Sequence, residues 1–224
     1  MTQERFSTIE ECCEFARQLN KIKKFTFKKK LEQKDNVVAM HLALIKHIDE
    51  IVNRVCTRHE LKCQWNLNYR LPNNKMLGVC YYEHREIELN PIALFYGVGH
   101  LRNVILHELA HLTQPGHRTD FWRTDILYLQ EENLLPWGEI VEKTEINTDS
   151  KLLVHKLFLN GKLIVECYSR GCREWYDVYY HNHNMVELGY KRWNTVRMAR
   201  TKKVMEEIIK NTPNKKELAI KVRL

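Results

Sequence analysis

The sequence predicts an α+β fold: N-terminal helices, a small antiparallel sheet, a helix that carries the main motif, and a C-terminal three-stranded sheet followed by a helix. Three features support this prediction. Residues 1–71 contain neither glycine nor proline, which favours a helical start. Trp65, Leu67 and Tyr69 alternate with polar residues, as in a half-buried strand. Asn160-Gly161 separates two further strand-like runs and is a favoured residue pair for a tight β-hairpin turn.

Two helices, separated by a lysine-rich segment, are expected at the N-terminus. Residues 7–10 (S-T-I-E) read as a capping box and predict a short helix that ends near Asn20. Residues 21–34 contain seven lysines, which could contact phosphates but fit a solvated loop or helix face better. The polar pair at 35–36 predicts the start of a long helix over residues 37–59. Its apolar positions follow the helical period: Leu44, Ile48, Ile51, Val52 and Val55.

Three strands and then two helices are expected in the middle of the chain. Alternating polar and apolar residues predict the strands at 65–69, 77–82 and 86–89. Apolar residues at the helical period predict the helices at 101–113 and 119–132. This part of the chain therefore supplies the small antiparallel sheet and the helix that carries the main motif.

The rest of the chain is expected to form a linker and an appendage. Residues 142–151 have low hydrophobicity and no periodicity, so they are predicted to be the linker. The appendage is predicted to contain strands at 152–159, 162–168 and 174–180 and a basic helix at 195–210. The expected division is an N-terminal helix with the basic segment, a core, the linker and the appendage, at residues 1–36, 37–141, 142–151 and 152–224.

Positive charge is concentrated in the appendage. The chain has 36 basic and 28 acidic side chains, a net charge of +8. Residues 151–224 hold 16 of the basic and 7 of the acidic ones. Because cations neutralise phosphates and aromatic rings stack on unpaired bases, we expect DNA as a partner. The expected contact residues are Lys191, Arg192, Trp193, Arg197, Arg200, Lys202 and Lys203.

Residues 107–111 read H-E-x-x-H on a predicted helix. One helical turn separates the two histidines, so both imidazoles can reach one metal ion, and zinc suits such ligands. The glutamate points to a different side and can act as general base on zinc-bound water. A sharp turn at Pro115-Gly116 could bring a third histidine beside the metal. We therefore predict one catalytic Zn²⁺ bound by His107, His111 and His117, with Glu108 as the catalytic base.

Two stretches around this motif resemble a known family. Residues 104–111 (V-I-L-H-E-L-A-H) and 115–122 (P-G-H-R-T-D-F-W) look like the SprT-like (Spartan-like) zinc metallopeptidases and the related YgjP-type metallopeptidases. The hairpin at 77–91 is similar to the strand pair that those families place before the active-site helix. The resemblance covers residues 37–135. It implies a minigluzincin-like α+β core with an H-E-x-x-H active-site helix.

The resemblance also implies an activity. SprT-like proteins cleave DNA-bound proteins, including DNA–protein crosslinks, so a zinc metallopeptidase acting on such substrates is the expected function. Phe121 and Trp122 match the aromatic pair that follows the third histidine, and we expect them to pack against that ligand's segment. Which group stabilises the oxyanion stays open among His100, Tyr96 and Tyr128.

Two other functions and a second metal site remain as alternatives. The chain could be a nucleic-acid-binding protein with a vestigial metal site, or a zinc hydrolase of a small molecule or nucleotide. SprT-like proteins commonly carry a C-terminal zinc ribbon with two C-x-x-C pairs, which this chain lacks. A second metal site could instead use Cys167, Cys172, His181 and His183, but free thiols and exposed histidines fit these spacings better. The appendage is then a degenerate ribbon without a second structural zinc ion.

Cysteine usage and hydropathy predict the compartment. The seven cysteines are an odd number, and the N-terminal residues lack the apolar core of a secretory signal, which argues against a disulfide framework. No apolar run reaches the roughly 18 residues of a membrane span. We therefore expect an intracellular protein, cytoplasmic or nuclear, that is not secreted and has no membrane partner.

Overall fold

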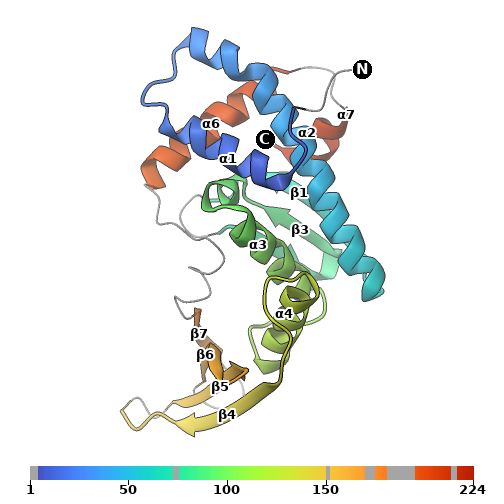
Figure 1. Cartoon of the computed structure of the whole chain (residues 1–224), viewed down its shortest axis with the longest axis vertical. Coiled ribbons are helices and arrows are strands. Elements are labelled where there is room, and N and C mark those ends of the chain that lie inside the picture. The colour runs from blue at the N-terminus through green and yellow to red at the C-terminus, as the bar shows by residue number, and fades with distance from the viewer. Residues whose placement is uncertain (1–4, 73–75, 150–151, 170–174, 181–194, 213–215) are drawn as a thin grey trace.

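The structure, a computed structural model, describes residues 5–72, 76–149, 152–169, 175–180, 195–212 and 216–224. Helices and two four-stranded sheets make up these residues, so the predicted α+β class is confirmed. Figure 1 shows helices from the first and last parts of the chain at one end of the molecule, the first sheet in the middle and the second sheet at the other end. Within the described residues, no helix has both the length and the apolar character needed to cross a bilayer.

Helix α1 (Ile9–Lys21) starts with a capping box, as predicted, but one residue further along the chain. The Thr8 side chain accepts a hydrogen bond from the Glu11 backbone N–H, and the Glu11 carboxylate accepts one from the Thr8 N–H. The expected pair was Ser7 with Glu10. The Glu11 carboxylate also accepts hydrogen bonds from the N–H and the hydroxyl group of Ser7, so Glu11, and not Glu10, serves as the acidic partner of the cap.

Helix α2 (Phe27–Arg58) begins ten residues before the predicted start. Thr26 caps it by accepting a hydrogen bond from the Lys29 N–H, and the helix continues through the polar pair at 35–36. The prediction of a cap at Asp35 or Asn36 was therefore wrong. Residues 28–34 are mostly Lys, Leu, Glu and Gln, which favour a helix, and they outweigh the weak helix preference of Asp and Asn.

The first sheet has the strand order β2-β3-β1-β8 and is mixed. Strand β2 (Gly78–Tyr81) pairs antiparallel with β3 (Glu86–Leu89), and a 3₁₀ turn, η1 (Tyr82–His84), joins them. Strand β1 (Gln64–Asn68) lies parallel to β3 and also to the last strand, β8 (Val222–Arg223). The prediction of an antiparallel sheet is thus right only for the hairpin, because strands far apart in the sequence complete the sheet.

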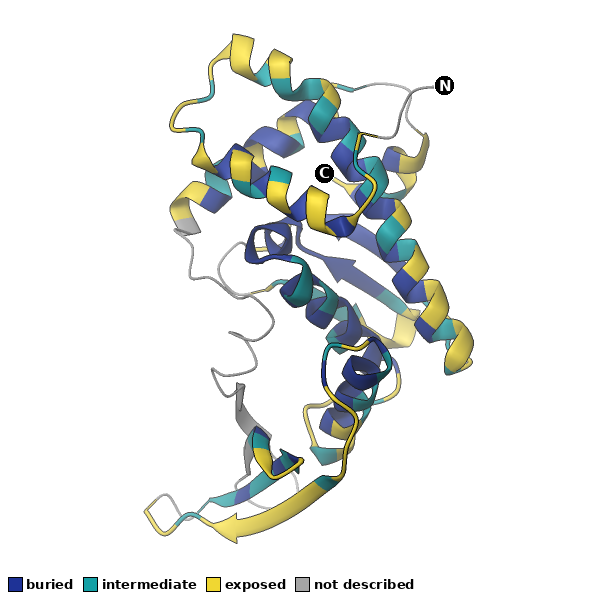
Figure 2. Ribbon diagram, viewed as in Figure 1, coloured by how far each residue is buried: buried dark blue, intermediate teal, exposed yellow. Residues whose placement is uncertain are grey.

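The motif helix packs between this sheet and its neighbours. Helix α3 (Val98–Ala110) follows a buried 3₁₀ segment, η2 (Pro91–Tyr96), that the sequence did not predict, and it starts and ends three residues before its predicted bounds. Helix α4 (Thr119–Glu131) packs beside α3. Figure 2 shows that buried residues are concentrated in the first sheet and in the helices around it.

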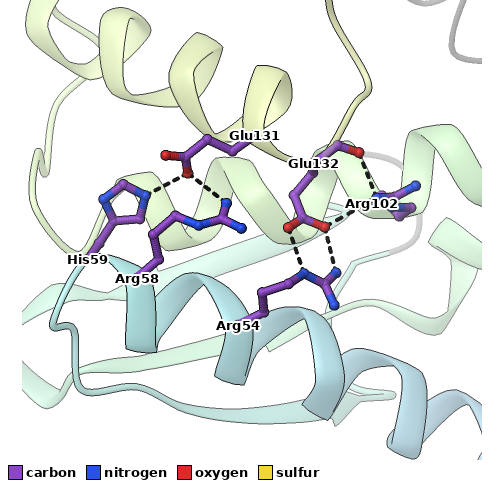
Figure 3. Close-up of polar contacts among 6 residues, drawn as sticks. All are labelled: Arg54, Arg58, His59, Arg102, Glu131 and Glu132. Atoms are coloured by element: carbon purple, nitrogen blue, oxygen red, sulfur yellow. Dashed lines mark hydrogen bonds and ion pairs between the residues drawn. The ribbon is translucent and has the colours of Figure 1, made fainter.

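A network of ion pairs joins the C-terminal ends of α2 and α4 to each other and to α3 (Figure 3). The buried Glu132 accepts two hydrogen bonds from Arg54, at 2.8 and 2.6 Å, and one from Arg102 at 3.2 Å. Its neighbour Glu131 contacts Arg58 and His59. Burial raises the pKa of Glu132, but the hydrogen bonds and charge of Arg54 and then of Arg102 outweigh it, so the net pKa lies below the usual value.

The second sheet is an antiparallel meander of four strands rather than the three that were predicted. Its members are β4 (Ile140–Ile146), β5 (Leu153–Leu159), β6 (Lys162–Ser169) and β7 (Trp175–Tyr180). The tight turn at Asn160-Gly161 is as predicted, because both residues have positive φ, 51° and 77°. The predicted linker at 142–151 is wrong in its first half, which belongs to β4. This strand is an edge strand and exposed along most of its length, so it lacks the alternation by which strands are recognised (Figure 2).

The last part of the chain returns to the N-terminal helices instead of joining the second sheet. Helix α6 (Thr195–Lys210) has the predicted bounds but lies beside α1 and α2 (Figure 1). Arg200 donates hydrogen bonds to the carbonyls of Ile22 and Lys23, and α7 (Lys216–Lys221) packs on α2 and leads into β8. Residues 152–224 therefore do not form one appendage, because the apolar face of α6 is buried against the core.

Candidate metal centre

Three histidines converge at the end of α3. His107 lies in the last turn of the helix, His111 caps its C-terminus, and His117 comes from the loop that leads to α4. The Nε2 atom of His117 lies 3.1 Å from Nε2 of His107 and 3.2 Å from Nε2 of His111. In a tetrahedral site with bonds of 2.0–2.1 Å, two ligand nitrogens are roughly 3.3 Å apart. The spacing of these nitrogens therefore suits a shared divalent cation.

The outer nitrogens of two of these rings face acceptors. Nδ1 of His111 lies 3.1 Å from the carbonyl oxygen of Gln114, and Nδ1 of His107 lies 3.8 Å from Oδ1 of Asp125. An acceptor at Nδ1 favours the tautomer whose lone pair is on Nε2, the atom that points to the shared centre. Burial lowers the pKa of His107 well below its usual value, and it lowers the pKa of His117 to about 4. Both rings are thus neutral near pH 7, as metal ligands must be.

Aromatic residues of α4 pack around the three rings. Phe121 stacks on His111 with the ring centroids 4.2 Å apart, and it meets His107 edge-on. Trp122 donates a hydrogen bond of 3.1 Å from Nε1 to the carbonyl oxygen of His117. Both aromatic side chains are fully buried, as predicted. They hold the loop of the third histidine against the helix that bears the other two.

Glu108 lies next to this cluster and is buried, with 7% of its surface exposed. Burial raises the pKa of its carboxyl group to about 8, and the charge of Asp125 acts in the same direction. The carboxylate packs against the backbone of β2 at Gly78. It also borders a cavity of about 620 Å³ that the three histidines line.

This cavity lies between β2, α3 and the loop of His117. Within the described residues, β2 pairs only with β3, and three of its residues, Gly78, Val79 and Cys80, border the cavity. Of the three candidates for oxyanion stabilisation, His100 borders the cavity. Tyr96 and Tyr128 are buried in the apolar core.

Sequence reasoning missed three residues of this site: Gly78, Tyr82 and Asp125. A signal did exist for Asp125, because it lies on the same face of α4 as the aromatic residues at 121 and 122. An acidic residue on the buried face of a helix calls for a polar partner. No such signal marks Gly78 of β2 or Tyr82 of η1, which reach the site because β2 packs beside α3 and η1 follows it directly.

The expected nucleic-acid contacts divide into three groups. Lys191, Arg192 and Trp193 lie outside the described residues, and Arg197 and Lys203 are exposed. Lys202 was expected to be accessible, but it is 4% exposed and donates a hydrogen bond to the carbonyl oxygen of Leu71. The guanidinium of Arg200 is occupied by two backbone carbonyls. The face of α6 that carries these two residues packs onto the core, so their side chains are engaged within the fold, and their contact with nucleic acid stays a prediction.

The second metal site of the sequence analysis cannot be placed. Cys172, His181 and His183 lie outside the described residues, as does the side chain of Cys167. Among the described residues, His107, His111 and His117 form the one group with the donor atoms and spacing for a metal ion.

Comparison with known proteins gives one match. A family model described as YgjP-like, metallopeptidase domain, matches residues 6–128, which is more than half of the chain. The matched part extends from just before α1 to the last turn of α4 and contains all three histidines. Neither a curated protein nor a solved structure matches the chain.

Proposed function

Because the chain belongs to the YgjP-like metallopeptidase family, we propose that it hydrolyses peptide bonds at a zinc ion bound by His107, His111 and His117. The observation that carries this proposal is the convergence of three Nε2 atoms at 3.1 and 3.2 Å, with the outer nitrogens of two rings turned to acceptors. The buried aromatic residues around the rings support it, because they keep the three ligands in place before any metal binds.

Glu108 is the proposed catalytic base. A bound zinc ion would polarise the scissile carbonyl, lower the pKa of water and favour the ionised form of the nearby carboxylate. Glu108 then takes a proton from the attacking water and later delivers it to the leaving amine. The close approach to Gly78 limits the positions that the carboxylate can take at the border of the cavity.

The edge strand β2 is the proposed site for the substrate backbone. Gly78, Val79 and Cys80 border the cavity, and β3 occupies only one edge of this strand. An extended peptide can add to such an edge through backbone hydrogen bonds, which places a peptide bond beside the metal without a deep side-chain pocket. This arrangement favours unfolded or flexible protein segments as substrates.

We further propose that DNA brings the protein substrate to the site. The resemblance of residues 104–122 to SprT-like enzymes supports this, and so does a group of exposed cations that we call the basic surface. Arg200 of α6 donates hydrogen bonds to the carbonyls of Ile22 and Lys23, so the exposed cations of α6 and of the turn between α1 and α2 belong to two segments in direct contact. The basic surface consists of Lys21, Lys23, Lys24, Lys28, Lys29, Arg197 and Lys203.

Zinc content and protein cleavage, measured together, test the proposal. Wild type is expected to contain one zinc ion per chain and to cleave an unfolded protein such as casein. It should cleave a protein crosslinked to DNA at a higher rate than casein. Glu108→Gln should keep the zinc and lose about 10²- to 10⁴-fold in rate. Glu83→Gln, a change at an exposed glutamate on the 3₁₀ turn after β2, is the control and should keep both.

The outcomes separate the alternatives. Cleavage of casein without any effect of DNA would keep the peptidase and reject the DNA part of the proposal. DNA binding without cleavage under any condition would favour a vestigial site. Turnover of nucleotides without cleavage of protein would favour a small-molecule hydrolase.

A further inference from the structure

We propose that Asp125 is a positioning residue that holds His107 in place as a metal ligand by accepting a hydrogen bond from its Nδ1–H. This inference rests on the proposed function, since it concerns the same metal centre. It goes beyond the proposed function by assigning a fifth residue, on a different helix from His107 and Glu108. Asp125 lies in the middle of α4, whereas His107 lies on α3.

The geometry of Asp125 supports this role. Its side chain is buried, with 1% exposed, and Oδ1 lies 3.8 Å from Nδ1 of His107. This separation exceeds a hydrogen bond by less than 1 Å, which a small rotation of either side chain covers. Because the opposite nitrogen, Nε2, points to the shared centre, one ring joins the carboxylate to the metal position.

Helix α4 is fixed on both sides of Asp125, so the carboxylate has a defined place. On the N-terminal side, Trp122 donates a hydrogen bond to the carbonyl oxygen of His117. On the C-terminal side, Glu131 and Glu132 form the ion pairs with α2 and α3 shown in Figure 3. The helix therefore cannot turn the carboxylate away from His107 without breaking interactions at both ends.

The chemistry of imidazole explains why a carboxylate is useful here. A neutral ring must carry its proton on Nδ1 if Nε2 is to bind the metal, and an anion beside Nδ1 stabilises that tautomer. The same anion increases the electron density on Nε2 and so strengthens the metal bond. His111 receives only a neutral carbonyl oxygen, from Gln114, so His107 is the ligand with charged support.

A role confined to packing would predict different behaviour. Burying a carboxylate is costly unless it is paired or hydrogen-bonded. A neutral side chain of the same shape would then be tolerated, and the folded protein would bind zinc as before. If Asp125 positions His107, the same neutral side chain weakens zinc binding even though the apo fold is intact.

Zinc affinity of purified full-length protein, measured by competition with a chromophoric chelator, tests the proposal. Asp125→Asn should bind zinc about tenfold more weakly, and Asp125→Ala up to about 100-fold more weakly, because loss of such partners typically costs 10- to 100-fold. Asp120→Asn is the matched control: it removes a carboxylate from the exposed first turn of the same helix and should keep wild-type affinity. Thermal melting of each metal-free protein reports whether the fold is retained.

Binding by folded Asp125→Asn within twofold of wild type would overturn the positioning role. Asp125→Asn has nearly the shape of the original residue, so the test does not depend on whether Asp125→Ala folds. Failure of wild type itself to take up zinc would instead remove the proposed function. The two failures are therefore distinguishable.

Discussion

Gly78 of β2 lies directly against the carboxylate of Glu108 of α3. A Cβ atom built at position 78 would be 2.6 Å from Cγ of Glu108 and 2.7 Å from its Oε1. Both distances are well below van der Waals contact, so no residue with a side chain fits there unless Glu108 moves. Because residue 78 has no side chain, the carboxylate of Glu108, the proposed base, can occupy this position.

Gly78→Ala should lower the rate of proteolysis about 100-fold while zinc stays bound, because a shift of about 1 Å in a catalytic group costs this much. Steady-state kinetics and metal analysis on the same sample check it. Gly116→Ala is the matched control, since a Cβ at that position has no atom within 4 Å. Equal kinetics for both variants would mean that Glu108 adapts or is not the base.

Trp122→Phe should weaken zinc binding about fivefold. The change keeps an aromatic ring but removes the indole N–H that holds the carbonyl oxygen of His117, and a hydrogen bond of this kind contributes about 1 kcal/mol. Chelator competition measures the effect. Trp137→Phe, at an indole that is 62% exposed, provides the comparison and should leave affinity unchanged.

Glu132→Gln should lower the free energy of unfolding at pH 7 by about 2 kcal/mol, because the buried carboxylate loses charged hydrogen bonds to Arg54 and Arg102. Urea denaturation measures this quantity. Glu145→Gln removes half of an exposed ion pair with Lys156 and should change it by less than about 1 kcal/mol.

The comparison of wild type with Glu132→Gln also predicts a dependence on pH. The folded-state pKa of Glu132 is lowered below 4.5, so its contribution is fully present above that pH. As pH falls through the lowered pKa, the carboxylate takes up a proton in the folded state and the contribution disappears. The stability difference between wild type and Glu132→Gln should therefore shrink below about pH 4.5. A difference that stays constant to pH 3 would show that charge is not its origin.

Lys28→Ser with Lys29→Ser should weaken DNA binding and flatten its dependence on salt. The slope of log affinity against log salt concentration should fall by roughly 0.9 for each phosphate that the double variant no longer neutralises. Fluorescence anisotropy over a range of salt concentrations measures both effects. Lys62→Ser with Lys143→Ser removes two exposed lysines that lie outside α6 and the turn between α1 and α2, and it serves as the control. An identical salt slope in the two double variants would reject the basic surface as the binding site.

Local sequence was enough for the features that depend on neighbouring residues. The H-E-x-x-H spacing places two imidazoles one helical turn apart in any α-helix, and the Asn160-Gly161 pair fixes its turn by backbone sterics alone. The same reasoning failed at residues 142–151, because an exposed edge strand has no buried face and so leaves no periodic pattern.

Only the tertiary structure decided which distant residues meet. The pairing of β8 with β1, the return of α6 to the N-terminal helices and the burial of Lys202 depend on which apolar faces cover one another. The positions of Gly78 and Asp125 beside the histidine cluster have the same origin, because β2 and α4 both pack on α3. Sequence by itself indicated which three histidines come together, since their spacing is a property of one helix and one turn. Their surroundings depend on packing, a property of the whole chain that no local window of residues contains.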